Sequence, residues 1–291
     1  MENSNNSLLD FINAYFELIK SFEPTFIKSF NKGSTDKNIN LISQKRYIIT
    51  DDIWEIIQDD NYKFIGLYIQ LLKIYGKEYE KELNTINNIF FIDNSFSKEF
   101  TLNVLKNENK LLFDFARDNN FSTEFISFFS VLLAFPYRKA VADFVKHKTN
   151  LTNHNSGLCP VCGHWPVISY ITEKEGKKIM ACICCSTTWQ FRRLKCSFCL
   201  NENKEDLGYL NIENYNDISA YVCDKCRRYI KTLKIKDEES IYFNQKYIID
   251  YLTTGDIDIA AIQNKYIQES ILGTRYTDPN DKNFEKYLQK L

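Results

Sequence analysis

Closely spaced cysteines are the residues of this sequence with the clearest chemistry. All nine cysteines of the 291-residue chain lie between Cys159 and Cys226. A C-x2-C turn directs two sulfur atoms toward one metal ion, and four thiolates complete a tetrahedral zinc or iron site. Eight of the cysteines form four such pairs and therefore predict two S₄ metal sites: Cys159 and Cys162, Cys182 and Cys185, Cys196 and Cys199, Cys223 and Cys226.

Disulfides and a catalytic thiol are the alternatives to metal ligation. The N-terminal stretch MENSNNSLLD lacks the basic and apolar regions of a secretory signal, so we expect a cytoplasmic protein. In a reducing cytosol, clustered cysteines are more often metal ligands or catalytic groups than disulfide partners. A single C-x2-C pair would be weak evidence for a metal, but four pairs in a repeated arrangement are strong evidence.

The ninth cysteine, Cys184, falls inside the pair formed by Cys182 and Cys185. A register that used Cys184 and Cys185 could not form a knuckle, because adjacent residues project in different directions. We therefore predict that Cys184 is not a ligand. A vicinal redox pair is the alternative, and it is disfavoured because Cys185 is needed as a ligand.

Extended runs separate the cysteine pairs and predict two β-hairpins with a C-x2-C turn at each end. The runs of the first hairpin are 167–172 and 178–182, those of the second are 208–213 and 218–223, and third strands follow at 188–194 and 229–236. This is an internal repeat with a period of about 40 residues. The cysteines thus belong to two repeated β units.

Two pairings of the four C-x2-C turns are possible. The hairpins favour sequential pairing, because each hairpin brings its own two turns together. An interleaved cross-brace, as in RING domains, is the alternative, but those domains usually include a histidine ligand. Only His154 and His164 lie near the cysteines. We expect His164, which follows the first pair, to be a polar loop residue.

Residues 1–155 predict an all-α bundle of roughly six to eight helices. Apolar residues recur at helical spacing in 7–22, 53–75 and 113–145. We expect Ser7 to cap the first helix, Pro24 to end it, and Pro136 to divide the third stretch into two helices. A Gly-rich phosphate loop, an HExxH motif and a catalytic triad spacing are all missing from this part of the sequence.

The sequence predicts an α+β protein in three parts. These are an N-terminal helical domain at 1–155, a tandem four-C-x2-C metal-binding domain of two small β units at 156–236, and a C-terminal helical segment at 237–291. The longest apolar stretch, 125–135, is far too short to span a bilayer. The sequence gives no indication of the oligomeric state.

Charge is distributed unevenly along the chain. Its formal net charge is −1, but residues 159–236 carry 13 basic and 8 acidic side chains, a net +5 that leaves −6 for the remainder. The basic side chains concentrate after two of the cysteine pairs: Arg192, Arg193, Lys195, Lys225, Arg227, Arg228, Lys231, Lys234 and Lys236. A nucleic-acid-binding ribbon could use them. We favour the alternative, that they offset negative metal–thiolate centres and meet an acidic protein partner.

The order of these motifs resembles the formate dehydrogenase accessory protein family, FdhE. The resemblance covers 159–231, about a quarter of the chain, and rests on Cys159-Pro-Val-Cys-Gly163, Pro166, Cys182-x2-Cys185, Trp189, Arg193, Cys196-x2-Cys199, Cys223-x2-Cys226, Tyr229 and Lys231. Two features depart from the family pattern, namely His164-Trp165 in place of small polar residues and the additional Cys184. The tail at 250–273 is only loosely similar.

The resemblance implies a helical domain followed by two rubredoxin-like or zinc-ribbon metal sites. It also implies a cytoplasmic, non-catalytic maturation factor that binds the catalytic subunit of a molybdenum- or tungsten-dependent formate dehydrogenase. Two hypotheses stand beside it: a zinc-ribbon nucleic-acid-binding protein, and a rubredoxin-like electron-transfer or thiol-redox protein. Iron and zinc both accept S₄ geometry, so the choice of metal stays open.

Overall fold

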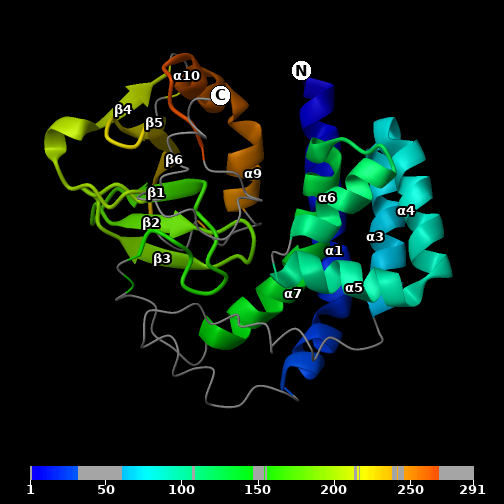
Figure 1. Cartoon of the computed structure of the whole chain (residues 1–291). Coiled ribbons are helices and arrows are strands. Elements are labelled where there is room, and N and C mark those ends of the chain that lie inside the picture. Colours follow the sequence, from blue (N-terminus) through cyan, green and yellow to red (C-terminus); the bar gives the residue numbers. More distant parts are fainter. Residues whose placement is uncertain are drawn as a thin grey trace. The chain divides into compact units, whose positions relative to one another are not determined.

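The chain divides into two compact units, Met1–Lys148 and Thr149–Leu291. The computed structural model describes residues 2–31, 61–106, 109–146, 154, 156–212, 215, 217–237, 241 and 246–268. Figure 1 shows helices in the first unit, and a sheet with two further helices in the second. The predicted α+β class is confirmed, while the three-part division of the chain stays a prediction.

Six α-helices lie in the described part of the first unit. They are α1 (Glu2–Asn31), α3 (Asn61–Tyr75), α4 (Glu80–Ile92), α5 (Asn94–Lys106), α6 (Asn109–Asp118) and α7 (Thr123–Lys146). Helix α7 packs against α1, α5 and α6, and aromatic side chains fill much of the space between the helices. The rings of Phe100, Phe115 and Phe129 are typical of this core, with centroids 5.3 Å apart for Phe100 and Phe115.

The structure corrects three predicted helix boundaries. Helix α1 begins at Glu2 and continues to Asn31, so Ser7 is not its N-cap and Pro24 does not end it. Pro136 lies inside α7, and the chain breaks earlier, after α6. The part of the predicted second helix at 53–60 lies outside the described residues.

Backbone hydrogen bonding explains why α7 continues through Pro136. A proline has no N–H, so the carbonyl four residues earlier loses its helical partner. That carbonyl belongs to Leu132, and the hydroxyl of Tyr15 donates to it at 2.5 Å. The neighbouring Phe135 and Tyr137 are buried, and each contributes about 1.5–3 kcal/mol, enough to offset the cost of the proline.

The true break follows α6, where Asn120 adopts a positive φ of 55°. The N–H of Phe121 donates to the carbonyl of Ala116 at 2.8 Å, which closes the helix end in the manner of a Schellman motif. Asparagine tolerates the left-handed conformation that this motif needs. The sequence Asp-Asn-Asn at 118–120 was therefore the signal for the break.

Helix α7 is the one described helix that is long and apolar enough to cross a membrane by length and composition. The stretch is Thr123–Asp143, and 67% of its most apolar window is buried within the protein. That degree of burial is typical of the core helix of a soluble protein.

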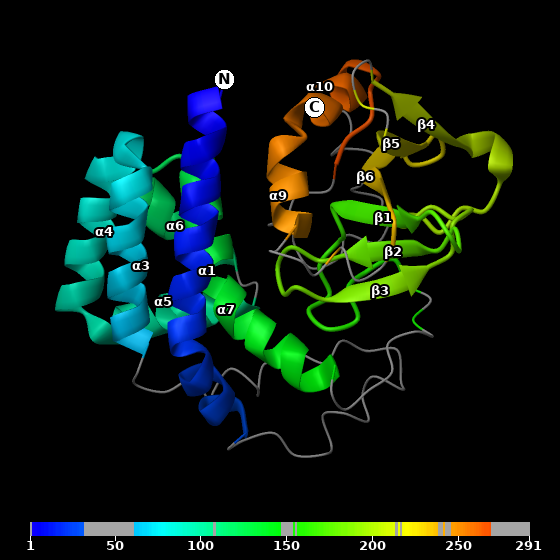
Figure 2. The ribbon, with the colours of Figure 1, turned by 180° about the vertical axis from the view of Figure 1, so that it is seen from behind.

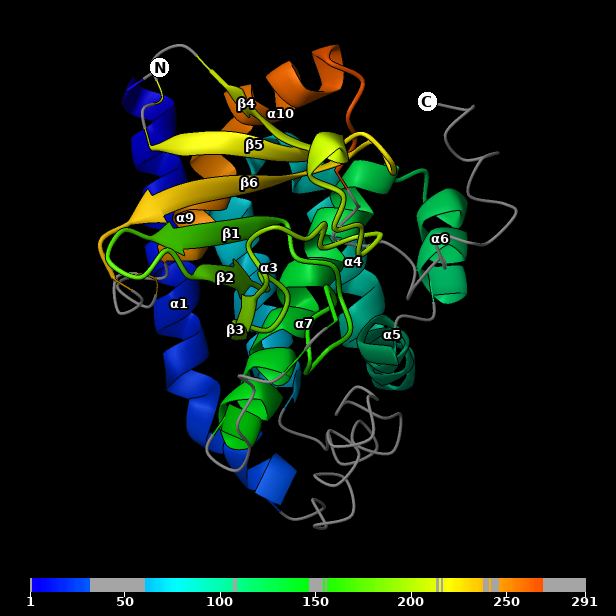
Figure 3. The same ribbon diagram turned by 90° about the vertical axis from the view of Figure 1, so that its left-hand side faces the viewer.

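The second unit contains one six-stranded mixed sheet in the order β3-β2-β1-β6-β5-β4, seen in Figure 3. Its strands are β1 (Ile168–Thr172), β2 (Lys178–Ala181), β3 (Thr188–Phe191), β4 (Leu207–Asn211), β5 (Ile218–Cys223) and β6 (Arg228–Ile235). Strands β1–β3 and β4–β6 form two antiparallel meanders, which matches the predicted repeat. Parallel pairing of β1 with β6 joins the meanders into a single sheet, which the sequence did not predict.

Two helices, α9 (Lys246–Thr253) and α10 (Gly255–Gln263), pack against one face of this sheet (Figure 2). Alternate strand residues supply the apolar face, and buried polar side chains fix the helices in place. The hydroxyl of Tyr170 donates to Asp250 at 2.9 Å. The amino group of Lys231, which is 1% exposed, pairs with Asp258 at 2.6 Å. The C-terminal helices thus belong to the compact unit that holds the sheet.

Candidate metal centres

The four C-x2-C turns share one backbone conformation. In each, the N–H of the residue after the second cysteine donates to the carbonyl of the first cysteine, over 2.8–3.2 Å. That residue has a positive φ in every case: Gly163 at 72°, Ser186 at 65°, Leu200 at 59° and Arg227 at 55°. Only glycine adopts this conformation without strain, so three of the four turns hold an ordinary residue in a costly geometry.

The turns bring the first four thiols together. The sulfur atoms of Cys159 and Cys185 are 3.5 Å apart, as are those of Cys162 and Cys182. All four sulfurs lie within 4.8 Å of one another, and all four residues are buried. A tetrahedral ion with metal–sulfur bonds of about 2.3 Å separates its sulfurs by roughly 3.8 Å. A disulfide would need about 2.05 Å. The arrangement fits one four-coordinate ion.

The second four thiols form a similar group. Cys196 and Cys226 have their sulfurs 3.7 Å apart, and so do Cys199 and Cys223. The backbone N–H of Phe198 donates to the sulfur of Cys196 at 3.4 Å, which is the kind of contact that stabilises a metal-bound thiolate. Cys199 is only half-buried. The thiols thus group in the sequential pairing and not in a cross-brace.

The thiols of each group influence one another electrostatically. Hydrogen bonding with Cys196 lowers the pKa of the Cys199 thiol to about 7. Hydrogen bonding with Cys199 in turn raises the pKa of Cys196 well above its usual range. In the first group, burial raises the pKa of Cys182. Four thiolates can therefore coexist at these distances only beside a cation, because their mutual repulsion is otherwise uncompensated.

Comparison with known proteins agrees with this geometry. Residues 158–193 match the family described as FdhE, central domain. The chain resembles the FdhE family. A Protein FdhE homolog from Aquifex aeolicus (strain VF5) is 31% identical over 126 residues, which are 42% of this chain and 43% of that protein. Another from Rhizobium meliloti (strain 1021) is 35% identical over 83 residues, 26% of each chain.

These FdhE alignments span less than half the length of each relative. A solved structure extends the likeness to nearly the whole fold. The crystal structure of the FdhE protein from Pseudomonas aeruginosa superposes with a TM-score of 0.59 over 92% of both chains, at 15% sequence identity. At that identity the likeness shows a shared fold.

The two departures from the FdhE pattern are both buried. The Cys184 side chain is 1% exposed and belongs to neither group of four found among the described residues. His164 lies in a loop as predicted, but it is buried, with its Nδ1 3.2 Å from the carbonyl oxygen of Cys162. Trp165 packs on Phe198 with ring centroids 5.4 Å apart.

The contact between Trp165 and Phe198 links the two groups of thiols, because Trp165 follows the first turn of the first group and Phe198 lies within the first turn of the second. A second link is closer still. A Cβ at Gly157 would lie 1.6 Å from the carbonyl oxygen of Ser197, between Cys196 and Cys199. The sequence did not predict either link. Trp165 and Gly157 carry no periodic or motif signal for contacts with residues 33 and 40 positions away.

The basic residues of the FdhE-like region do not share one exposed face. Arg228 and Lys231 are buried, each 1% exposed. On the surface, Arg192 and Lys195 both pair with Glu202, at 2.7 and 3.0 Å. The structure therefore places much of the predicted positive cluster in ion pairs or inside the protein.

Proposed function

We propose that this chain is a metal-binding accessory protein for formate dehydrogenase maturation. It binds the catalytic subunit of a molybdenum- or tungsten-dependent enzyme in the cytoplasm, before assembly is complete. The observation that carries the proposal is the pair of four-thiol groups, which occur in the FdhE motif order within an FdhE-like fold.

The eight cysteines of the two groups act as the metal ligands in this proposal. Iron or zinc bound there would hold the turns together and neutralise the thiolates. Four protein ligands fill a tetrahedral site, so neither ion keeps a position for a substrate. The arrangement therefore supports a binding role rather than catalysis by the chain itself.

One observation favours a second candidate, electron transfer through iron. Cys199 is half-buried, so the second site lies close enough to the surface for a redox partner to approach. Protein purified without oxygen should then be coloured and show a reversible reduction potential. Zinc in both sites, measured by elemental analysis, would exclude this candidate and leave the accessory role standing.

The nucleic-acid-binding alternative has weaker support. Binding of a phosphate backbone needs exposed, unpaired cations along one face. Here Arg192 and Lys195 pair with Glu202, and Arg227 pairs with Asp224. Retention of partners after nuclease treatment would separate a protein partner from nucleic acid.

The central experiment is co-purification of the formate dehydrogenase catalytic subunit with the tagged chain. The double variant Cys196→Ser and Cys199→Ser should lose the second metal and weaken co-purification. Cys184→Ser is the matched control, because it changes a neighbouring buried thiol outside both groups. Deleting the gene should abolish formate dehydrogenase activity without preventing synthesis of the catalytic subunit. Normal formate oxidation in the deletion strain would refute the proposal.

A further inference from the structure

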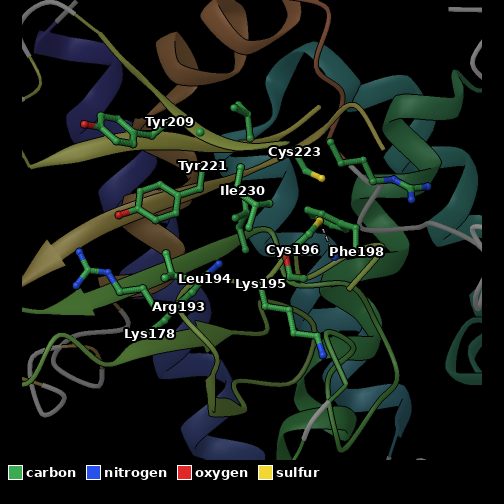
Figure 4. Close-up of a pocket in the computed structure, with 15 residues that line it drawn as sticks. Lys178, Arg193, Leu194, Lys195, Cys196, Phe198, Tyr209, Tyr221, Cys223 and Ile230 are labelled. Atoms are coloured by element: carbon green, nitrogen blue, oxygen red, sulfur yellow. Dashed lines mark hydrogen bonds between the residues drawn. The ribbon is translucent and has the colours of Figure 1, made fainter. Parts of the chain in front are cut away.

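A cavity of about 210 Å³ opens beside the second group of thiols. It lies in the second unit, among strands β2, β4, β5 and β6 and the turn that follows β3. Figure 4 shows Tyr209, Tyr221 and Arg193 toward one side of the cavity, and Cys196, Cys223 and Phe198 toward the other. The cavity is separate from the tetrahedral interior of the thiol group, although it shares a wall with it.

The most unusual residue of this wall is Lys178, on strand β2. The residue is only 3% exposed and lines the cavity. Its amino group lies 5.6 Å from the ring centroid of Tyr221 and 5.9 Å from that of Phe191. Within the described part of the chain, its partners are these rings and the thiol of Cys196, which acts on it electrostatically, and none of the ion pairs includes it. A buried ammonium group is costly unless an anion or hydrogen-bond acceptor meets it.

The remaining charged lining residues have the same sign. Arg193, Lys195 and Arg228 join Lys178 around the cavity, and the described lining contains no aspartate or glutamate. Lys195 is paired with Glu202 outside the lining, whereas Arg193 is exposed at the mouth. The thiols of Cys196 and Cys223 also line the cavity, on the side away from Arg193 (Figure 4), and clustered cations concentrate anions on the side that they occupy. The occupant that fits this wall is an anion.

Size and shape restrict the anion further. Pockets for drug-sized ligands and cofactors occupy about 300–1,000 Å³. The 210 Å³ available here suits a group the size of one amino acid residue. Two apolar side chains stand exposed at the rim, Leu194 at 59% and Tyr209 at 64%. They offer an apolar surface to whatever carries the charge.

We propose that this cavity binds a carboxylate attached to an aromatic or aliphatic group, with the carboxylate on Lys178 and the apolar part against Leu194 and Tyr209. Two sources have this chemistry: a small free aromatic acid, and the C-terminal residue of a peptide segment. The site does not depend on the accessory role proposed above. The competing explanation is that Lys178 only offsets the negative charge of the neighbouring thiolates.

The test uses the full-length, metal-loaded protein and matched pairs of probes. Benzoate is compared with benzamide, its neutral isostere, and the tripeptide acetyl-Ala-Ala-Phe is compared with its C-terminal amide. Isothermal titration calorimetry measures the affinity of each probe. Changes in the NMR chemical shifts of the tyrosine rings show whether the probe binds in the cavity. The acids should bind at least about tenfold more tightly than the amides, because a charge-assisted hydrogen bond is lost in the amides.

Three single-residue variants test whether the carboxylate binds at Lys178. Lys178→Met should weaken binding of the acids by at least about tenfold. Lys174→Met, in the exposed turn of the same hairpin, is the matched control and should leave binding unchanged. If Lys178→Met fails to fold, Arg193→Met at the exposed mouth should still weaken binding by about threefold or more.

The possible results separate the explanations. Binding of both acids supports a general carboxylate site, and binding of the peptide acid alone supports a peptide terminus as the source. Equal binding of acids and amides overturns the proposal. So does a Lys178→Met variant that binds the acids normally. Loss of the second metal in Lys178→Met, with no binding of acids to the unmodified protein, would assign Lys178 to charge compensation instead.

Discussion

All four cysteines of the first group are buried, whereas the second group lies beside a cavity and leaves Cys199 half-buried. The turns themselves do not cause this difference, since all four have the same hydrogen bond and the same positive φ. What differs is the covering of the turns. The hydroxyl groups of Ser186 and Tyr247 hydrogen-bond each other beside the first group, which ties its turn to α9.

The second group is covered less completely, since Cys199 is half-buried. Its last turn is held by the chain after α10, where the guanidinium of Arg227 lies 4.2 Å from the ring centroid of Tyr266. Its first turn borders the cavity through Cys196 and Phe198. The turns therefore set the ligand geometry, while the surrounding elements set access to each site. We expect the first site to be structural and the second to be the more exchangeable one.

Removal of both metals should have the largest effect. Structural zinc in small domains contributes about 10–16 kcal/mol to folding. Chelation should therefore unfold residues 157–236 while the helices of the first unit survive. Limited proteolysis with mass spectrometry would show cleavage confined to the sheet region. Complete metal removal with unchanged protease resistance there would contradict the prediction. When metal release is followed over time after addition of a chelator, the ion of the second cysteine group should leave before the ion of the first group.

The ligand register of the first group is the next test. Cys185→Ser removes one of four thiols that lie within 4.8 Å of one another and should cost one of the two ions. Cys184→Ser changes the adjacent thiol and should leave the metal content at that of the unmodified protein. Elemental analysis of both variants decides the matter. Equal loss of metal from the two would mean that the register is wrong.

The parts of the fold and of the cysteine groups that could be predicted are those that depend on residues close in sequence. The C-x2-C turns and alternating strands depend on neighbours in sequence. All six strands were therefore placed to within a few residues, and the eight cysteines form the two expected groups, while their role as metal ligands stays a prediction. The parallel pairing of β1 with β6 joins residues about 63 positions apart, such as Ile168 and Lys231, and no local pattern encodes it. Pro136 was misjudged for the same reason, because its compensating donor is Tyr15.

The sequence also did not predict which charged residues are buried. Lys178 and Lys231 look alike in a basic stretch, yet both are buried, and among the residues that the structure describes only Lys231 of the two pairs with a carboxylate, that of Asp258. That distinction depends on where α10 packs, which is a tertiary property. The asymmetry between the two metal sites arises in the same way, since the two sequence repeats are alike in their ligands.

Gly157→Ala should damage the second site selectively. The added methyl group would meet the carbonyl oxygen of Ser197 at 1.6 Å, so the turn that bears Cys196 must shift. Overpacking of this kind costs about 1–3 kcal/mol. We expect a lower midpoint of urea unfolding and loss of one ion, with the first site still loaded. The matched variant Gly255→Ala meets nothing within 4 Å and should be near neutral. Equal metal content in both variants would contradict the prediction.

Lys178→Met should stabilise the protein in the absence of a bound carboxylate, in a manner that depends on pH. Burial lowers the pKa of Lys178 to about 8, from 10.5 for an exposed lysine. The unfolded state thus binds more protons between these values, and the buried charge costs the native state on the order of 3 kcal/mol below pH 8.

The gain from Lys178→Met should therefore be full at pH 7 and fade as the pH rises from 8 to 10.5. Urea unfolding of both proteins at several pH values measures it. The other ionisable groups lining the cavity are Arg193, Lys195, Cys196, Tyr209, Tyr221, Cys223 and Arg228. They are present in both proteins, and of these groups Cys196 also acts electrostatically on Lys178. A gain that does not change with pH would show that the charge of Lys178 is already compensated.

The smallest effect on stability should come from substitutions at the turn residues with positive φ. These substitutions test how the elements that cover each site affect its stability. Leu200 has a φ of 59° and is 44% exposed, so little packing is lost when it is replaced. Asparagine tolerates this conformation better than leucine, and a β-branched residue tolerates it worse. Leu200→Asn should therefore stabilise the second site by about 0.5–1 kcal/mol, and Leu200→Val should destabilise it by a similar amount.

The equivalent change in the first site should have the opposite sign. Ser186 has a φ of 65° but is buried, and its hydroxyl is bonded to Tyr247. Ser186→Asn would gain the same backbone relief and lose that hydrogen bond in a place without room for a larger side chain, at a net cost of about 1–2 kcal/mol. Urea midpoints of the metal-loaded variants compare the two. If both asparagine variants were stabilising, the covering by α9 would not distinguish the sites, and the backbone strain of the turn alone would govern them.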